Sequence, residues 1–454
     1  MKILGLLLAC AAVLCAQPSS FEGAWSGTLD AGALKLRIGL DIKSEDGKLS
    51  ATLDSPDQGA LGIPLDSVTV DANRIRFSKQ SLTLTYEGVL ADGRIDGTLT
   101  QAGQRLPLAF ERGKPKASAR PQYPLPPLPY DAEEVTVSSG EVRLAGTFTH
   151  PKQGGPFAAI LLVTGSGPQD RDETVFNQKP FLVISDYLTR AGYAVLRLDD
   201  RGTAKSTGNF STSGLAEFTD DALAAVAWLK TRPDVNAKRI GILGHSEGGM
   251  VGPLAAVRSE DVAFVIMLAG PAQPFDELMA EQSAGLMRVA GAPQEAIQAN
   301  IEVSRTLYAV LRQEPDNAKA RERFHQVLAD WKLNGKQPEL AAQLEAGMDK
   351  LLTPEIRSAF AYSAAGTLSK LRCPVLALFG GKDLQVPADS NLRAAAAAFA
   401  AGHVASVTLV KLPGLNHLFQ TAKTGSVTEY AQSEETISPR ALEAIATWLR
   451  ANVQ

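Results

Sequence analysis

The chain has 454 residues, of which 45% are hydrophobic, and it carries a formal net charge of −4. This length exceeds one ordinary domain, and the hydrophobic content is sufficient for large cores. The slightly acidic balance argues against nucleic acid or an anionic membrane surface as a main partner.

The first segment, residues 1–16, has the pattern of a signal peptide. Lys2 precedes an apolar run over 3–14, and the small residue Ala16 precedes Gln17. The run is too short to span a membrane, and no later segment reaches that length, so we expect an exported protein, periplasmic or secreted, without an integral span. Cys10 offers the alternative of a lipid anchor, although the apolar run before it is short.

Residues 21–112 differ in composition from the rest of the chain. Apolar and polar residues alternate with period two, as in 34–42 and 82–90, and glycine and aspartate turns separate these runs. The pattern predicts an antiparallel all-β module, either a small barrel or a sandwich. It could bind a ligand or partner, cover a cleft or only stabilise the chain. Prolines then dominate 113–130, which predicts a stiff linker.

From 131 to 454, buried strand patterns alternate with amphipathic helix patterns, which predicts a mostly parallel sheet covered by helices on both faces. The strand over 158–163 leads into a loop of small residues over 164–172. Such a backbone can approach a ligand closely. We expect the Ser166 amide, or alternatively that of Gly167, to bind an oxyanion there; an ordinary Gly/Pro turn is the other interpretation.

Gly244-His245-Ser246-Glu247-Gly248 is the most informative motif of the chain. An apolar strand pattern precedes it and a helix pattern of small residues follows it. A strand that turns sharply into a helix exposes its middle residue, and flanking glycines permit the turn. Ser246 is therefore the predicted nucleophile, and the backbone N–H of Glu247 is the second predicted oxyanion donor.

A helix-rich insertion is predicted over about 273–366, between the strand 263–268 and the strand 373–379. At that place it would lie over the carboxyl edge of the sheet as a lid. Asp383 follows the strand 373–379 and is the predicted orienting acid, with Asp389 as the fallback.

A serine nucleophile requires a base, and the chain has five histidines. His417 alone follows a late strand, over 406–412, and the turn Pro413-Gly414-Leu415-Asn416. A loop after a late parallel strand is where a base meets a nucleophile at the carboxyl edge. His417 is therefore the predicted base, and the chain order Ser246, Asp383, His417 is that of the α/β-hydrolases.

These motifs resemble the α/β-hydrolase superfamily, and more narrowly its bacterial serine hydrolases of the serine aminopeptidase and dienelactone-hydrolase-like branches. The resemblance covers residues 133–454 and rests on four segments: 165–172, 198–206, 244–249 and 414–417. Thr164 departs from it, because many relatives carry a histidine there. Since members include esterases and peptidases, the resemblance implies the chemistry more narrowly than the substrate.

We therefore expect an exported serine hydrolase that cleaves carboxylic esters through an acyl-enzyme on Ser246. A peptidase acting on short peptides or amides is the first alternative, and a non-catalytic binding protein is the second. No cofactor and no metal are expected, because the histidines are scattered and no zinc, Walker A or Rossmann pattern is present. A small-molecule ester or short peptide is the expected partner, whereas the oligomeric state does not follow from the sequence.

Overall fold

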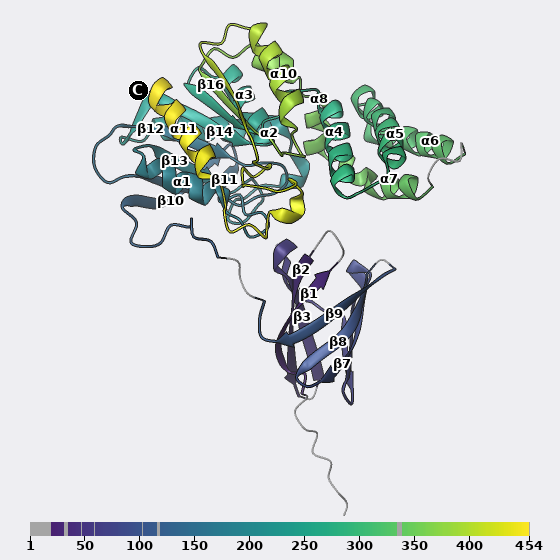
Figure 1. Cartoon of the computed structure of the whole chain (residues 1–454). Coiled ribbons are helices and arrows are strands. Elements are labelled where there is room, and N and C mark those ends of the chain that lie inside the picture. Colours follow the sequence, from purple (N-terminus) through teal and green to yellow (C-terminus); the bar gives the residue numbers. More distant parts are fainter. Residues whose placement is uncertain are drawn as a thin grey trace, which may run out of the picture. The chain divides into compact units, whose positions relative to one another are not determined.

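The chain folds as two units, residues 1–117 and residues 118–454 (Figure 1). The computed structural model describes residues 20–30, 35–46, 48–58, 60–101, 103–115, 119–333 and 338–453. The predicted signal peptide, with Cys10, lies outside these residues. Among the described helices, none combines the length and the apolar character needed to cross a bilayer.

The first unit is a curved antiparallel sheet, whose described strands follow the order β4-β3-β2-β1-β9-β8-β7-β6-β5 (Figure 1). Its concave side encloses an apolar core that includes Phe21, Trp25 and Phe110. These strands form a half-barrel, so a two-sheet sandwich, one of the two expected arrangements, is wrong. The strands are β1 (Gly23–Asp30), β2 (Lys35–Glu45), β3 (Lys48–Ser55), β4 (Ala60–Pro64), β5 (Ser67–Asp71), β6 (Arg74–Lys79), β7 (Leu84–Ala91), β8 (Arg94–Gln101) and β9 (Gln104–Arg112).

The second unit contains a sheet of order β10-β11-β13-β12-β14-β15-β16-β17. The pairs β10/β11 and β11/β13 are antiparallel, and all later pairs are parallel, which confirms the predicted mostly parallel sheet. The strands are β10 (Tyr130–Ser139), β11 (Val142–Pro151), β12 (Phe157–Val163), β13 (Ala194–Leu198), β14 (Val235–His245), β15 (Phe264–Leu268), β16 (Val375–Gly380) and β17 (Val407–Leu412).

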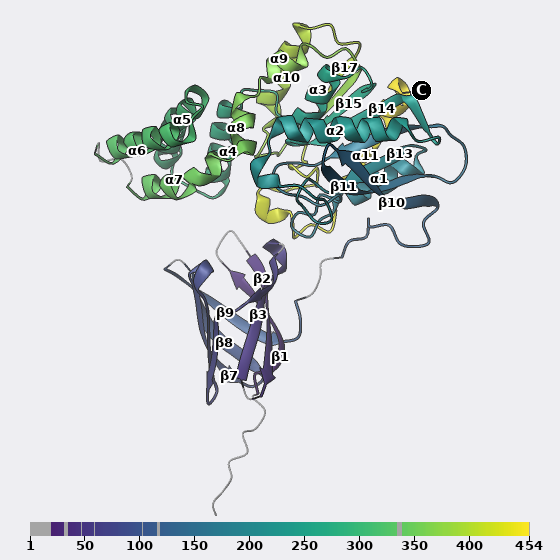
Figure 2. The ribbon, with the colours of Figure 1, turned by 180° about the vertical axis from the view of Figure 1, so that it is seen from behind.

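Helices cover both faces of this sheet (Figure 1, Figure 2). On one face, α2 (Leu215–Lys230) and α3 (Gly248–Arg258) pack on β12 and β14, and α10 (Ala388–Ala400) packs on β16 and β17. On the other face, α1 (Pro180–Arg190) packs on β11 and β13, and α11 (Pro439–Asn452) packs on β16. The carboxyl ends of β14, β16 and β17 consequently meet at one edge of the sheet.

The chain between β15 and β16 folds into helices (Figure 2). Buried side chains of these helices form an apolar core of their own. The helices occupy the range in which the sequence predicts an insertion. They are α4 (Phe275–Val289), α5 (Gln294–Gln313), α6 (Asn317–Leu333), α7 (Pro338–Leu351), α8 (Pro354–Ala361) and α9 (Ala364–Leu368). Helix α8 is joined to the start of α2 through Ser358, whose Oγ accepts a hydrogen bond from the Leu215 amide at 3.0 Å.

Candidate active site

Ser246 lies in the sharp turn between β14 and α3, with a φ of 53°. The turn leaves no room for side chains on either side of it. A Cβ at Gly244 would lie 1.9 Å from the carbonyl oxygen of Gly248, and a Cβ at Gly248 would lie 2.2 Å from that of Val163. The two glycines are therefore required by backbone contact, and Ser246 remains partly exposed at the edge of the sheet.

Asp383 and His417 are hydrogen-bonded to each other. His417 Nδ1 donates to Asp383 Oδ2 at 2.8 Å, and His417 and Asp383 are 4% and 5% exposed respectively. The other carboxylate oxygen, Oδ1, accepts the amides of Gln385 and Val386 at 2.8 and 2.9 Å. These bonds fix the carboxylate, which in turn orients the imidazole with Nδ1 toward Asp383 and leaves Nε2 as the nitrogen that can act as a base.

The His417 ring also lies beside the elbow. Its centroid is 4.8 Å from that of His245, the residue before Ser246 in the chain. The fallback acid is placed elsewhere: Asp389 lies in the first turn of α10, and its carboxylate accepts from Lys411 Nζ at 2.7 Å. Asp383, rather than Asp389, is therefore the carboxylate that contacts the candidate base.

The loop after β12 offers one free amide between two occupied ones. Gly165 N–H donates to Glu173 Oε1 at 2.8 Å, and Gly167 N–H donates to Glu355 Oε1 at 2.7 Å. In the described part of the chain, the amides of Ser166 and Glu247 donate to no protein acceptor. The loop lies against the elbow, since a Cβ at Gly165 would be 3.3 Å from Ser246 Cβ. Ser166 and Glu247 are thus available to bind an oxyanion, whereas Gly167 is not.

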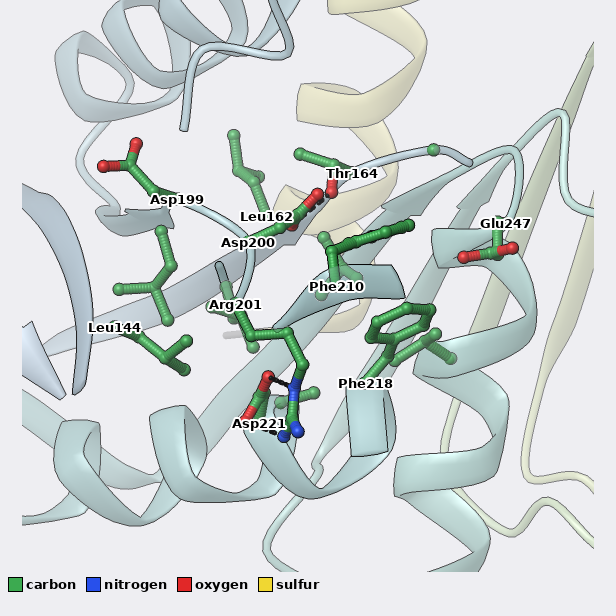
Figure 3. Close-up of a pocket in the computed structure, with 16 residues that line it drawn as sticks. Leu144, Leu162, Thr164, Asp199, Asp200, Arg201, Phe210, Phe218, Asp221 and Glu247 are labelled. Carbon is green, nitrogen blue, oxygen red and sulfur yellow. Dashed lines mark hydrogen bonds and ion pairs between the residues drawn. The ribbon is translucent and has the colours of Figure 1, made fainter. Parts of the chain in front are cut away.

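A pocket of ≈ 60 Å³ adjoins this loop and the elbow (Figure 3). Its walls are mostly carbon: Figure 3 shows the stacked rings of Phe210 and Phe218 within it, and the Arg201–Asp221 ion pair below them. The carboxyl groups of Asp200 and Glu247 also line the pocket. The remaining lining residues are Leu144, Leu161, Leu162, Val163, Thr164, Gly165, Leu198, Asp199, Ala222 and Val251.

Both of these carboxyls hold their protons more tightly than usual. Burial raises the pKa of Asp200 to about 8, although Thr164 Oγ1 and the Gln169 amide donate hydrogen bonds to it at 2.8 and 2.9 Å. Burial raises the pKa of Glu247 well above its ordinary value, and the nearby negative charges of Glu355 and Asp200 raise it further. The pKa of Glu247 therefore lies well above that of an ordinary glutamic acid, and its carboxyl group is hydrogen-bonded to Glu355.

This burial predicts that the protein loses stability as pH rises. Above pH 4.5 the folded state keeps a proton on Glu247 that the unfolded state releases. The free energy of unfolding then falls with pH, by up to about 1.4 kcal/mol per pH unit for one such group, until the pH reaches the folded pKa. We expect Glu247→Gln, which still donates to Glu355, to unfold at a higher urea concentration than the wild type at pH 9 and to show a shallower pH dependence between pH 5 and 9.

Tryptophan fluorescence is a suitable probe for this measurement, because three of the four tryptophans, Trp228, Trp331 and Trp448, belong to the second unit. The matched control is Glu295→Gln, at an exposed position in the first turn of α5. Equal pH slopes for the wild type and Glu247→Gln would contradict the raised pKa of Glu247.

A group of possible metal ligands lies outside this site. Glu133, His150 and Asp234 place one ligand atom each within 4.8 Å of the others. However, Arg232 Nη2 donates to Glu133 and Asp234 at 3.0 and 2.9 Å, so a guanidinium already neutralises both carboxylates. The arrangement is an ion-pair network at the far end of the strands.

Two residues of the site do not follow from the sequence pattern. Glu173 contacts Gly165 and His245, and Glu355 contacts Gly167 and Glu247. Glu173 stands beyond the loop segment that carries the resemblance. The only local signal at Glu355 is its place after the helix-capping Thr353, whose Oγ1 accepts from Ile356 N, and this signal predicts a helix start rather than a site.

Comparisons with known proteins identify a family and several relatives of the chain. The family model described as X-Pro dipeptidyl-peptidase (S15 family) matches residues 139–405, more than half of the chain. The chain is 37% identical over 185 residues to esterase EstD of Thermotoga maritima, covering 41% of this chain and 43% of that protein. It is 32% identical over 139 residues to an uncharacterised protein of Mycobacterium tuberculosis, covering 31% of this chain and 46% of that protein. The chain thus matches less than half the length of these relatives.

Among solved structures, Est1E of Butyrivibrio proteoclasticus with bound ferulic acid has a TM-score of 0.44 and 16% identity, covering 70% of this chain and 99% of that one. The residues matched by the family model include Ser246 and Asp383 and end before His417.

Proposed function

Because the chain belongs to the X-Pro dipeptidyl-peptidase (S15) family and is an α/β-hydrolase of the serine hydrolase type, we propose that it cleaves carboxylic esters through an acyl-enzyme on Ser246. The observation that carries the proposal is the buried hydrogen bond of 2.8 Å between His417 Nδ1 and Asp383 Oδ2, beside the elbow that bears Ser246. A histidine oriented by a carboxylate next to a partly exposed serine in a sharp turn is the arrangement that activates a hydroxyl nucleophile.

In the proposed reaction, Ser246 Oγ attacks the carbonyl carbon of the ester as His417 Nε2 takes the hydroxyl proton. Asp383 stabilises the imidazolium, and the amides of Ser166 and Glu247 bind the oxyanion of the tetrahedral intermediate. His417 then gives its proton to the departing alcohol, which leaves Ser246 acylated. A water molecule, deprotonated by His417, attacks the acyl group, and the proton returns to Ser246 as the acid leaves.

The pocket of Figure 3 suggests the size of the acyl group. Its lining includes Gly165, which precedes the proposed oxyanion donor Ser166, and Glu247, which is the other proposed donor. The pocket volume of ≈ 60 Å³ favours a short acyl chain. The bond from Gly167 to Glu355 of α8 supports the proposal that the helical insertion acts as a lid, because it joins an insertion helix to the oxyanion loop. A lid at this point would exclude water from the acyl-enzyme.

Turnover of p-nitrophenyl esters with increasing acyl length tests this function. We expect acetyl and butyryl esters to give a higher kcat/KM than octanoyl and longer esters, because the longer chains exceed the pocket. Covalent labelling by a fluorophosphonate probe, measured on the same preparation, separates an enzyme from a binding protein. A wild-type chain that is neither labelled nor active on any ester would contradict the proposal.

Hydrolysis of peptides from their amino end is a second candidate, and the convergence of Glu247 and Glu355 favours it. Such a peptidase needs a carboxylate cluster near the nucleophile to hold the ammonium group of its substrate. Glu247 follows Ser246 directly, and Glu355 contributes a carboxylate from α8. The pair carries one negative charge when Glu247 is protonated, which is sufficient to pair with one ammonium group.

Glu355→Gln separates the two activities. The new amide oxygen can still accept from Gly167, but the substitution removes the charge, so a peptidase should lose about 10- to 100-fold in kcat/KM for aminoacyl-anilides while ester turnover stays within about threefold. Glu295→Gln, which removes an equivalent first-turn charge from α5, should change neither activity. Anilide turnover that is absent from the wild type, or equal in wild type and Glu355→Gln, would remove this candidate.

A further inference from the structure

A second histidine–carboxylate pair lies buried beneath the candidate nucleophile. His245 Nδ1 is 2.7 Å from Glu173 Oε1, and the two residues are only 5% and 1% exposed. The other ring nitrogen, His245 Nε2, is 3.0 Å from the backbone oxygen of His417. This pair takes no part in the proton transfers of the proposed reaction, yet it is as deeply enclosed as Asp383 and His417.

Both ring nitrogens of His245 face oxygens, Glu173 Oε1 and the His417 carbonyl, so an imidazolium ring can donate to both of them. Burial by itself lowers the pKa of His245, but the charge and hydrogen bond of Glu173 outweigh burial and raise it above its ordinary value. The second oxygen of Glu173, Oε2, is buried and has no hydrogen-bond partner among the described residues. A charged carboxylate in such a position is stable only while its cationic partner stays in place.

The pair connects three separate loops of the candidate site. Glu173 Oε1 accepts from the Gly165 amide, in the oxyanion loop, at 2.8 Å. His245 belongs to the elbow, and it donates to the carbonyl of His417, in the loop that carries the base. Glu173 itself has a φ of 54°, a left-handed conformation that a non-glycine residue adopts only when its surroundings hold it there.

We propose that Glu173 and His245 form a positioning pair, a buried ion pair that holds the oxyanion loop and the base loop in register with Ser246. The proposal rests on the proposed function of the Ser246 site. The pair is bonded to the Gly165 amide at 2.8 Å and to the His417 carbonyl at 3.0 Å. Loss of either charge would release both loops, whereas Asp383 orients only the His417 ring.

Glu173→Gln is the principal test, because it preserves shape and removes the charge. A neutral His245 has one ring proton and can no longer donate both to the substituted side chain and to the His417 carbonyl. Since a displacement of about 1 Å in a reacting group costs about 100-fold in rate, we expect kcat per active site to fall about 100-fold while KM stays within about threefold. Inhibition by a boronic acid that mimics the tetrahedral intermediate should weaken in parallel with kcat/KM.

Active sites are counted by fluorophosphonate labelling, so that a fraction of unfolded protein does not count as lost activity. His245→Gln serves as the second variant, and we expect the same large fall in kcat with little change in KM. His150→Gln is the matched control, because it disrupts another histidine–glutamate pair, in which His150 Nε2 is 3.3 Å from Glu133 Oε1, on the first strands of the sheet. The kcat of this variant should stay within about twofold of the wild-type value, because His150 contacts none of the three loops.

An active wild type, together with Glu173→Gln and His245→Gln proteins that keep kcat per labelled site and boronate affinity, overturns this inference alone. That result would stand even if both variants melted at lower temperatures, because it would assign the pair to stability only. A wild type that neither reacts with the probe nor hydrolyses ester overturns the proposed function as well.

Discussion

Replacing Ser246 with alanine is expected to lower kcat/KM for p-nitrophenyl esters by about 10⁴- to 10⁶-fold, because it removes the atom that forms the acyl-enzyme. The residual rate would come from oxyanion binding and substrate positioning alone. The substitution should leave folding unchanged, since Ser246 is partly exposed and alanine preserves the backbone amides of the turn. Fluorophosphonate labelling, measured by intact mass, should disappear at the same time.

The matched control for this variant is Ser259→Ala, at the other end of α3 from Ser246. It should retain both activity and labelling within about twofold, because among the described residues the Ser259 hydroxyl contacts only the Asp261 amide and none of the candidate site residues. If Ser246→Ala still reacted with one equivalent of the probe, another residue would be the nucleophile. If it retained ester turnover, the acyl-enzyme proposal would be wrong.

Replacing Asp383 with asparagine should lower kcat by about 10⁴-fold with little change in KM. The asparagine side chain can donate an N–H to His417 Nδ1, and this favours the ring tautomer that carries its proton on Nε2. In that tautomer Nε2 cannot accept the proton of the Ser246 hydroxyl. The geometry would otherwise persist, because the asparagine oxygen can still accept the amides of Gln385 and Val386. Stopped-flow acylation with p-nitrophenyl acetate would locate the loss in the acylation step.

Asp389→Asn provides the comparison for this variant, because Asp389 is the alternative acid in the sequence. Its carboxylate pairs with Lys411 at the surface, so we expect activity within about twofold of the wild type. The opposite pattern, a large loss in Asp389→Asn and a small one in Asp383→Asn, would reassign the orienting acid.

Local sequence patterns are sufficient for the candidate residues that follow strand ends. Ser246 could be selected because Gly244 and Gly248 flank it, and backbone contacts of 1.9 and 2.2 Å explain why no other residue fits there. Asp383 and His417 could be selected because each follows an apolar strand, and adjacent parallel strands end at one edge of the sheet. The mostly parallel order of this sheet likewise follows from the alternation of strands and helices.

The first unit shows where such patterns are insufficient. Period-two alternation predicted strands over 21–112 but could not distinguish a barrel from a sandwich, because both bury one face of each strand. The pairing of β1 with β9 decides the matter, since it joins the two ends of this segment within one curved sheet. Pairing between strands at opposite ends of a segment depends on tertiary packing rather than on local pattern.

By itself, the sequence determined the elbow, the chain order of the three candidate residues and the family, because these depend on backbone geometry within a few residues and on strand order. Only the tertiary structure decided what surrounds them. The Glu173–His245 pair and the contact between Glu247 and Glu355 join segments far apart in the chain. Their protonation follows from burial and from the charge of a neighbour, and both exist only once the loops and the insertion helix have packed together.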